Sequence, residues 1–184
     1  MDASPEILVF AGPNGSGKSS ITKRFPIVGL YINADEIKKR ANCSDLAAAQ
    51  EAEKIREYCL QHKTNFTFET VLSTRRNLDL LHRAKAAGYK ITSVYVTTAN
   101  VQLNILRVRS RVANGGHGVP SEKIISRYTL SMKNVKELVS LSDVCIVVDN
   151  TGSEAEIIFS KENERMDIQA DRFWTIDQIK ELIL

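Results

Sequence analysis

A glycine-rich stretch near the start of the chain has the residue types and spacing that hold nucleotide phosphates. Residues 11–20 read AGPNGSGKSS and directly follow the apolar run ILVF at residues 7–10. They match the pattern G-x-x-x-x-G-K-[ST] at every fixed position, with a strand expected before the loop and a helix after it. The residues predicted to bind the nucleotide through this loop are Gly12, Pro13, Asn14, Gly15, Ser16, Gly17, Lys18, Ser19 and Ser20.

The chemistry that this loop predicts is the binding of a nucleoside triphosphate. Glycines let the backbone curl so that successive N–H groups point at the phosphates, aided by the positive end of the following helix. Lys18 is placed to reach the β and γ phosphates, and the Ser19 hydroxyl to bind Mg²⁺, which neutralises charge during phosphoryl transfer. We therefore expect ATP and Mg²⁺ as cofactors, with Lys18 as a catalytic residue and Ser19 as a ligand of the metal.

A carboxylate at the next junction between a strand and a helix is the candidate for accepting a proton. The stretch NADEI at residues 33–37 falls where a short strand passes into a helix, at the sheet edge where ligands of open α/β folds bind. Asp35 could take a proton from an acceptor hydroxyl, and Asn33 is a candidate contact to the acceptor. Alternatively, Asp35 only stabilises the first turn of the helix through the macrodipole. The local pattern leaves both interpretations open.

Two polar residues near the end of another strand are candidates for binding the acceptor. Glu69 and Thr70 come late in FTFETVLS, a segment rich in β-branched and aromatic residues. The Glu69 carboxylate could hydrogen-bond a sugar or another polyol. The competing interpretation is a solvent-facing glutamate at the end of a strand.

Arginines on two successive helices predict a lid over the transferred phosphate. The segment NILRVRSR at residues 104–111 carries Arg107 and Arg111 on one face with Asn104, whereas Arg109 is out of step with them. A second helix carries Arg127 on its polar side, so we expect a lid at about residues 104–130. Arg111 and Arg127 are the candidate catalytic arginines, with Arg107 a candidate substrate contact. The competing interpretation is a charged, solvated helix face.

The break between these helices, GGHGVP at residues 115–120, contains a candidate substrate contact. His117 is isolated from cysteine and from other histidines, so it is predicted to contact substrate from the lid rather than a metal. Near the end of the chain, Asp149 closes the apolar segment VCIVVD and resembles a second acidic nucleotide-binding motif. Its late position also allows another arrangement, in which Asn150 and Thr151 lie beside the adenine ring.

The elements that must position these side chains alternate along the chain between strand and helix. Such alternation predicts an α/β fold of the P-loop kinase class, with a mostly parallel sheet, helices on both faces, a helical lid and a C-terminal hairpin. No linker or repeat marks a boundary, so residues 1–184 are expected to form one domain. The expected strands are Glu6–Ala11, Tyr31–Asn33, Thr67–Leu72, Ile91–Thr97 and Val144–Val148, with a hairpin turn at Lys161–Glu164.

The apolar stripes of the predicted helices indicate which side chains face the core. One helix is expected over Ser44–His62 and a last short helix from Thr175. The apolar stripes expected to be buried are Ala48, Ala52, Ile55 and Cys59; Val101, Ile105, Val108 and Val112; and Ile125, Tyr128, Met132, Val135 and Val139.

Composition excludes several classes of protein. Hydrophobic residues make up 43% and charged residues 26% of the 184 residues, which is typical of a soluble globular domain rather than a disordered or fibrous chain. No stretch approaches the length of a membrane span, and the three cysteines have no metal-binding spacing. The small net charge of +3 does not favour nucleic acid. We expect a cytoplasmic protein that binds neither membrane nor nucleic acid.

Taken together, AGPNGSGKSS, INADEI, FTFETVLS, RVANGGHGVP, IISRY and SDVCIVVDNT resemble, in this order, the zeta toxin family of P-loop kinases over roughly residues 6–151. The resemblance implies ATP-dependent phosphorylation of a hydroxyl of a small molecule, typically the 3′-hydroxyl of the amino sugar in UDP-N-acetylglucosamine. It implies Asp35 as the catalytic base, Glu69 and Thr70 as substrate contacts, and Arg111 and Arg127 as phosphate-stabilising arginines. A possible antitoxin partner cannot be read from this chain.

Two other functions remain open from the sequence. A nucleoside or polynucleotide kinase would use the same phosphate loop, although a polynucleotide kinase would need a basic or aromatic track for a strand. A regulatory module that binds ATP without transferring phosphate would have no need of Asp35.

Overall fold

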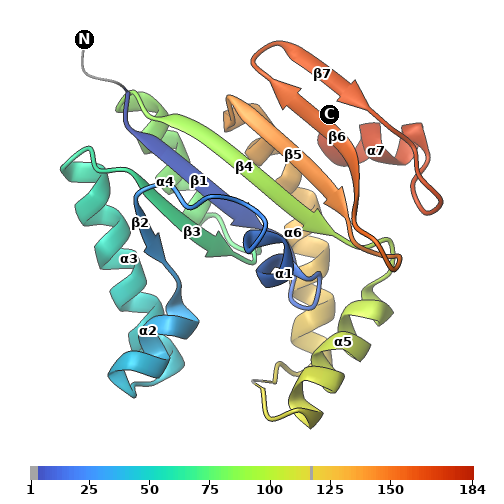
Figure 1. Cartoon of the computed structure of the whole chain (residues 1–184), viewed down its shortest axis with the longest axis horizontal. Coiled ribbons are helices and arrows are strands. Elements are labelled where there is room, and N and C mark those ends of the chain that lie inside the picture. The colour runs from blue at the N-terminus through green and yellow to red at the C-terminus, as the bar shows by residue number, and fades with distance from the viewer. Residues whose placement is uncertain (1–3, 117) are drawn as a thin grey trace.

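The computed structural model describes residues 4–116 and 118–184 of the chain and shows an α/β fold with a mostly parallel sheet (Figure 1). The strands and helices appear in an alternating order, as the sequence predicts. The strands are β1 (Glu6–Ala11), β2 (Leu30–Ile32), β3 (Phe66–Thr70), β4 (Lys90–Thr97), β5 (Val144–Asp149), β6 (Glu156–Glu162) and β7 (Arg165–Ile168). The helices are α1 (Lys18–Thr22), α2 (Ala34–Ala41), α3 (Asp45–Gln61), α4 (Arg76–Ala86), α5 (Val101–Ala113), α6 (Ser121–Leu141) and α7 (Ile176–Ile183).

The seven strands form one sheet in the order β2-β3-β1-β4-β5-β6-β7. The first five strands of this order are parallel, and the hairpin β6–β7 adds two antiparallel strands at one edge. In this register Ala11 at the end of β1 pairs with Thr70 on one side and Tyr95 on the other. The carboxyl ends of the central strands therefore lie together at one end of the sheet, where parallel sheets bind ligands.

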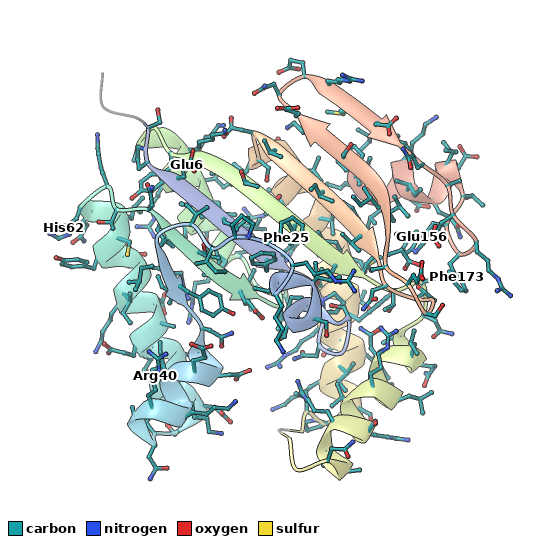
Figure 2. The ribbon with its side chains drawn as sticks, in the orientation of Figure 1. Glu6, Phe25, Arg40, His62, Glu156 and Phe173 are labelled. Atoms are coloured by element: carbon teal, nitrogen blue, oxygen red, sulfur yellow. The ribbon has the colours of Figure 1, made fainter. Side chains whose placement is uncertain are left out.

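The two faces of the sheet are covered unequally. One face packs Ile7 and Val9 of β1 into the larger hydrophobic core, against α3, α4, α6 and α7. The opposite face packs Phe10 into a smaller core with Ile21 of the short helix α1. Phe25, in the segment after α1, meets Phe10 edge to face at 5.7 Å and lies over this face in Figure 2. Helices thus lie on both faces, but the face beside the phosphate loop is covered by much less structure (Figure 1).

The predicted elements are found, with differences at their ends and on their buried faces. Strand β3 ends at Thr70 rather than Leu72, because Leu72 has a φ of 58° and its N–H binds the Thr70 hydroxyl in a turn. On α6 the buried residue is Ile124, while Ile125 is 43% exposed, so the predicted stripe was wrong there. Val112 is also 46% exposed, because the last turn of α5 projects beyond the body of the sheet (Figure 1).

The C-terminal segment follows its sequence signals closely. The turn of the predicted hairpin contains Asn163, whose φ of 53° is common for asparagine in tight turns. Thr175 caps α7 in a capping box with Gln178. Across residues 4–116 and 118–184, no helix combines the length and the apolar character needed to cross a membrane.

Candidate active site

The phosphate loop leaves β1 at the centre of the sheet and returns into α1. Gly12, Gly15 and Gly17 all have positive φ, at 140°, 79° and 96°. A side chain at Gly12 would place its Cβ 2.1 Å from the Val96 carbonyl oxygen, and the neighbouring strand β4 leaves no room for it. The glycines of the motif are therefore required by the backbone path of the loop as well as by the approach of a phosphate.

Two asparagines from distant parts of the chain hold this loop in place. The buried Asn104 of α5 donates from Nδ2 to the Asn14 carbonyl at 2.9 Å, and its Oδ1 accepts from the Thr98 hydroxyl. Asn150, directly after β5, donates from Nδ2 to the Ser16 carbonyl at 2.7 Å. The structure thus places Asn150 against the loop backbone, where it fixes the loop's shape. Its predicted contact with the nucleotide remains a prediction.

The loop also carries groups that are available to a phosphate. The Ser16 hydroxyl is fully buried and has no hydrogen-bond partner among the described residues. Ser19 and Ser20 are exposed in the first turn of α1. Within residues 4–116 and 118–184, no cluster of three or more His, Cys, Asp or Glu side chains is arranged to hold a metal. A magnesium ion at Ser19 would therefore take most of its ligands from phosphate oxygens and water.

Lys18 lies back across its own loop. Its ammonium donates to the carbonyls of Gly12 at 2.6 Å and Pro13 at 3.1 Å. Burial lowers the pKa of Lys18 to about 8; Glu69 opposes this shift, Arg111 adds to it, and Asp35 opposes it. These three predicted site residues are therefore close enough to influence the lysine electrostatically, although they come from β3, α5 and α2.

The Glu69 side chain is held at the edge of the sheet by hydroxyl groups. Its Oε1 accepts from Tyr31 at 2.7 Å and from Thr22 at 3.1 Å. Thr22 is the last residue of α1, so the carboxylate is bound directly to the helix that follows the phosphate loop. Burial raises the pKa of Tyr31, whose hydroxyl stays protonated as a donor to Glu69.

Thr70 has a more structural environment than its neighbour. Its hydroxyl accepts from the Leu72 N–H at 2.9 Å and from Asn77 Nδ2 at 2.8 Å, and its carbonyl accepts from the Gly12 N–H at 3.1 Å. A cavity of about 350 Å³ lies between α3 and α4 and is lined by Asn77 and the buried Arg56. The predicted contact between Thr70 and substrate remains a prediction.

Asp35 and Asn33 lie where β2 passes into α2, as predicted. Asn33 is the N-cap residue of α2, and its Oδ1 accepts from the Asp35 N–H at 2.9 Å. The Asp35 carboxylate is exposed and accepts no hydrogen bond from any other described side chain. Asn33 therefore caps the helix, and the Asp35 carboxylate is available to a ligand, but Asp35 also lies in the first turn of α2, so its stabilisation of the macrodipole stays open as the alternative.

The four arginines of the expected lid have different surroundings. Arg127 of α6 reaches the phosphate loop, with Nη1 donating to Asn14 Oδ1 at 3.4 Å. Arg111 is exposed near Lys18, whereas Arg109 faces Ser121. Arg107 is half-buried, and its Nη1 is buried without a hydrogen-bond partner among the described residues. Burial lowers the pKa of Arg107, an effect that Asp149 partly offsets.

Asp149 is part of the framework of the site. It is buried, and its carboxylate accepts from the Trp174 indole N–H at 3.0 Å and from the hydroxyl and N–H of Thr151. Burial raises the pKa of Asp149, and these hydrogen bonds oppose the shift. The side chain connects the end of β5 to the C-terminal segment. His117, also predicted as a substrate contact, lies outside the described residues.

Sequence reasoning missed the side chains that hold the predicted residues in position. Tyr31 and Thr22 bind Glu69, yet neither belongs to a motif. The Tyr31 contact depends on pairing between strands β2 and β3, and the Thr22 contact on pairing between β1 and β3. The weak signal for Tyr31 is its position two residues before Asn33 on the same short strand. Asn104 was placed on the arginine face of α5, but its contact with the phosphate loop was not foreseen.

Residues 30–163 match the family model described as Zeta toxin. This chain belongs to the zeta toxin family. The matched segment starts after the phosphate loop, so the loop is a separate observation that agrees with it. The protein is 26% identical over 127 residues to an uncharacterised protein of Haemophilus influenzae. This match covers 66% of this chain and 91% of the Haemophilus protein.

Solved structures show the same fold at low sequence identity. The protein matches a chain of the AvrRxo1-ORF1:-ORF2 structure with ATP at 12% identity and a TM-score of 0.71. The match covers 99% of this chain and 64% of the AvrRxo1 chain. In the related structure with sulphate ions it spans 62% of the matching chain. The PezAT chromosomal toxin–antitoxin system of Streptococcus pneumoniae matches at 14% identity and a TM-score of 0.62, over 99% of this chain and 79% of that one. The fold and the family together support an ATP-dependent kinase.

Proposed function

We propose that the protein transfers the γ-phosphoryl group of ATP to a hydroxyl of a sugar-bearing metabolite. The observation that carries this proposal is that a proposed acceptor-binding residue and a proposed phosphate-stabilising arginine both contact the phosphate loop or the helix α1 that follows it. Thr22 of α1 donates to Glu69 on the acceptor side, and Arg127 of the lid donates to Asn14 of the loop. A phosphate held by the loop would therefore lie between the carboxylate of Glu69 and the guanidinium of Arg127.

The phosphate loop fits ATP and Mg²⁺ by its own chemistry. Its glycines follow a path that excludes a Cβ, its buried Ser16 hydroxyl lacks a partner, and Lys18 adds a positive charge. Ser19 would hold Mg²⁺ through its hydroxyl, and the remaining loop residues would hold the phosphates. When bound, ATP and Mg²⁺ supply the transferable phosphoryl group and neutralise part of its charge. Lys18 would exchange its loop carbonyls for phosphate oxygens.

The acceptor hydroxyl would be activated by Asp35. As the acceptor oxygen forms its bond to the γ phosphorus, the bond from that phosphorus to the bridging oxygen breaks and ADP leaves. The proton of the hydroxyl passes to the Asp35 carboxylate, which is exposed and unbonded by other described side chains. Arg111 and Arg127 would stabilise the charge that develops on the transferred group, as arginine fingers do.

A nucleotide sugar such as UDP-N-acetylglucosamine is our first choice of acceptor. The carboxylate of Glu69 would accept hydrogen bonds from sugar hydroxyls and would repel the phosphate backbone of a nucleic acid. Asn33, Thr70, Arg107 and His117 are the further proposed contacts.

We also propose a partner, a domain extent and a cellular location for this protein. The PezAT structure is a toxin–antitoxin system, so a protein antitoxin is a candidate partner of this chain as well. We propose one domain over residues 1–184 and a cytoplasmic location. Co-purification of the chain with the product of a neighbouring gene, against the chain expressed alone, would test the partner.

The test of the reaction is incubation with Mg-ATP and a panel of acceptors, with mass spectrometry of the products. The panel contains UDP-N-acetylglucosamine, other nucleotide sugars, nucleosides and short RNA and DNA ends. We expect the mass of one phosphate to be added to a nucleotide sugar. Lys18→Ala should abolish this transfer, while its melting temperature without ATP stays the same as that of the parent. Phosphorylation of oligonucleotide ends alone would support the polynucleotide kinase instead. ATP binding without transfer to any acceptor would support the regulatory module.

A further inference from the structure

Glu69 has one oxygen that is fixed and one that is available. Oε1 accepts from Tyr31 at 2.7 Å and from Thr22 at 3.1 Å, whereas no described residue donates to Oε2. The Thr22 hydroxyl also lies 3.0 Å from the Lys18 carbonyl, and its single proton can serve only one of these acceptors at a time. Tyr31 has no competing acceptor among the described residues. Tyr31 is therefore the constant donor that sets the direction of the Glu69 carboxylate.

Tyr31 also connects Glu69 to the helix turn that carries Asp35. Asn33 donates from Nδ2 to the Tyr31 hydroxyl oxygen at 3.0 Å and accepts at Oδ1 from the Asp35 N–H at 2.9 Å. The Asp35 N–H can only donate, so the amide of Asn33 is fixed in this orientation. Three successive hydrogen bonds thus run from Glu69 through Tyr31 and Asn33 to the backbone of Asp35.

We propose that Tyr31 is a positioning residue that aligns the acceptor-binding carboxylate of Glu69 with the proton-accepting carboxylate of Asp35. This inference rests on the proposed kinase function. The two carboxylates come from strand β3 and helix α2, and among the described side chains the Tyr31 hydroxyl bonds to both Glu69 and the Asn33 cap. An acceptor hydroxyl that binds Glu69 Oε2 would then meet the helix turn that carries Asp35 in a fixed orientation, which is the geometric condition for efficient transfer.

The direct test is Tyr31→Phe, which removes only the hydroxyl. Loss of a hydrogen bond to a charged group predicts an increase of about tenfold in the KM for UDP-N-acetylglucosamine, with the KM for ATP unchanged. Tyr58→Phe is the matched control, because Tyr58 is an exposed tyrosine on α3 that stacks on His62. The same Tyr31→Phe change is then made in a Glu69→Ala background, where its effect on the acceptor KM should vanish. An equal effect in both backgrounds, or a matching rise in the KM for ATP, would show that Tyr31 acts on the fold and would overturn the proposal.

A second measurement does not depend on the reaction. The Asp35 amide is protected by Asn33, so its hydrogen exchange in the protein without nucleotide should accelerate several-fold in Tyr31→Phe and stay unchanged in Tyr58→Phe. If the parent phosphorylates no acceptor, the proposed function fails, and the exchange rate alone decides the link from Tyr31 to Asp35. A raised acceptor KM with unchanged Asp35 exchange would overturn that link.

Discussion

Raising the pH through 8 is expected to weaken ATP binding, because it removes the positive charge of Lys18. Burial of the ammonium lowers the pKa of this lysine from 10.5 to about 8. The lysine is charged below this pH and neutral above it. Its charged form is the one that attracts phosphate, so affinity falls as the pH rises above this pKa.

The size of the effect follows from the titration of one group. With a pKa of about 8, roughly ten in eleven lysines are charged at about pH 7 and roughly one in eleven at about pH 9. If binding requires the charged form, affinity at about pH 9 is about tenfold lower, which corresponds to about 1.4 kcal/mol. Calorimetric titration with an ATP analogue from about pH 6 to about pH 10 measures it.

Neighbouring charges provide an internal check on the sign. Glu69 raises the pKa of Lys18 and Arg111 lowers it. We call the pH above which ATP affinity falls the break. Glu69→Gln should therefore move this break to lower pH, and Arg111→Ala should move it to higher pH. Arg109→Ala, on the same helix but beside Ser121, should leave the break where it is. Lys18→Ala should bind weakly and without this break. A break that persists in Lys18→Ala, or shifts of the same sign in Glu69→Gln and Arg111→Ala, would refute the reasoning.

Three further predictions concern transfer and the loop. Asp35→Asn should lower kcat by about 10² to 10⁴ with little change in ATP affinity, as expected for a lost general base, and an undiminished rate would return Asp35 to helix stabilisation alone. Arg111→Ala and Arg127→Ala should each lower kcat more than they raise the KM for ATP, whereas Arg109→Ala should not; equal effects at all three would indicate a diffuse basic surface. Asn104→Ala should lower the free energy of unfolding by about 1–3 kcal/mol in denaturant titration, because it leaves the Asn14 carbonyl without its donor and the Thr98 hydroxyl with only the Asn100 carbonyl at 3.4 Å, and unchanged stability would contradict this role.

Much of the fold could be predicted because its signals are local. The phosphate loop combines an apolar strand, fixed glycines and a lysine within a few residues, and the hairpin and the cap at Thr175 are equally short-range. The apolar stripe on α6 was less secure. Ile124 and Ile125 are adjacent and equally apolar, so the sequence could not decide which one the neighbouring helix α5 covers.

The supports of the candidate site could not be predicted because they depend on distant pairing. Asn104 and Asn150 reach the phosphate loop from elements that follow it by 90 and 134 residues. Asparagine is common at helix starts and in turns, so nothing in its local pattern distinguishes a residue that holds a loop. The position of Tyr31 beside Glu69 likewise requires β2 to pair with β3, across a segment that contains α2 and α3.

The contacts divide the proposed machinery between the end of the sheet and helices α5 and α6. Strand β3 serves both sides of the reaction, since the Thr70 carbonyl accepts from Gly12 of the phosphate loop while Glu69 is held by Thr22 and Tyr31. These bonds link β2, β3 and α1, so the Glu69 carboxylate and the phosphate loop are held by the same elements. Helices α5 and α6 reach these elements through Arg127, whose Nη1 lies 3.4 Å from Asn14 Oδ1, through Asn104 near the start of α5, and through the Tyr128 hydroxyl, which donates to the Thr98 carbonyl at 2.6 Å. Substitutions around Tyr31 and Glu69 should therefore change which acceptor is bound, whereas substitutions of the lid arginines should change how fast a bound acceptor is phosphorylated.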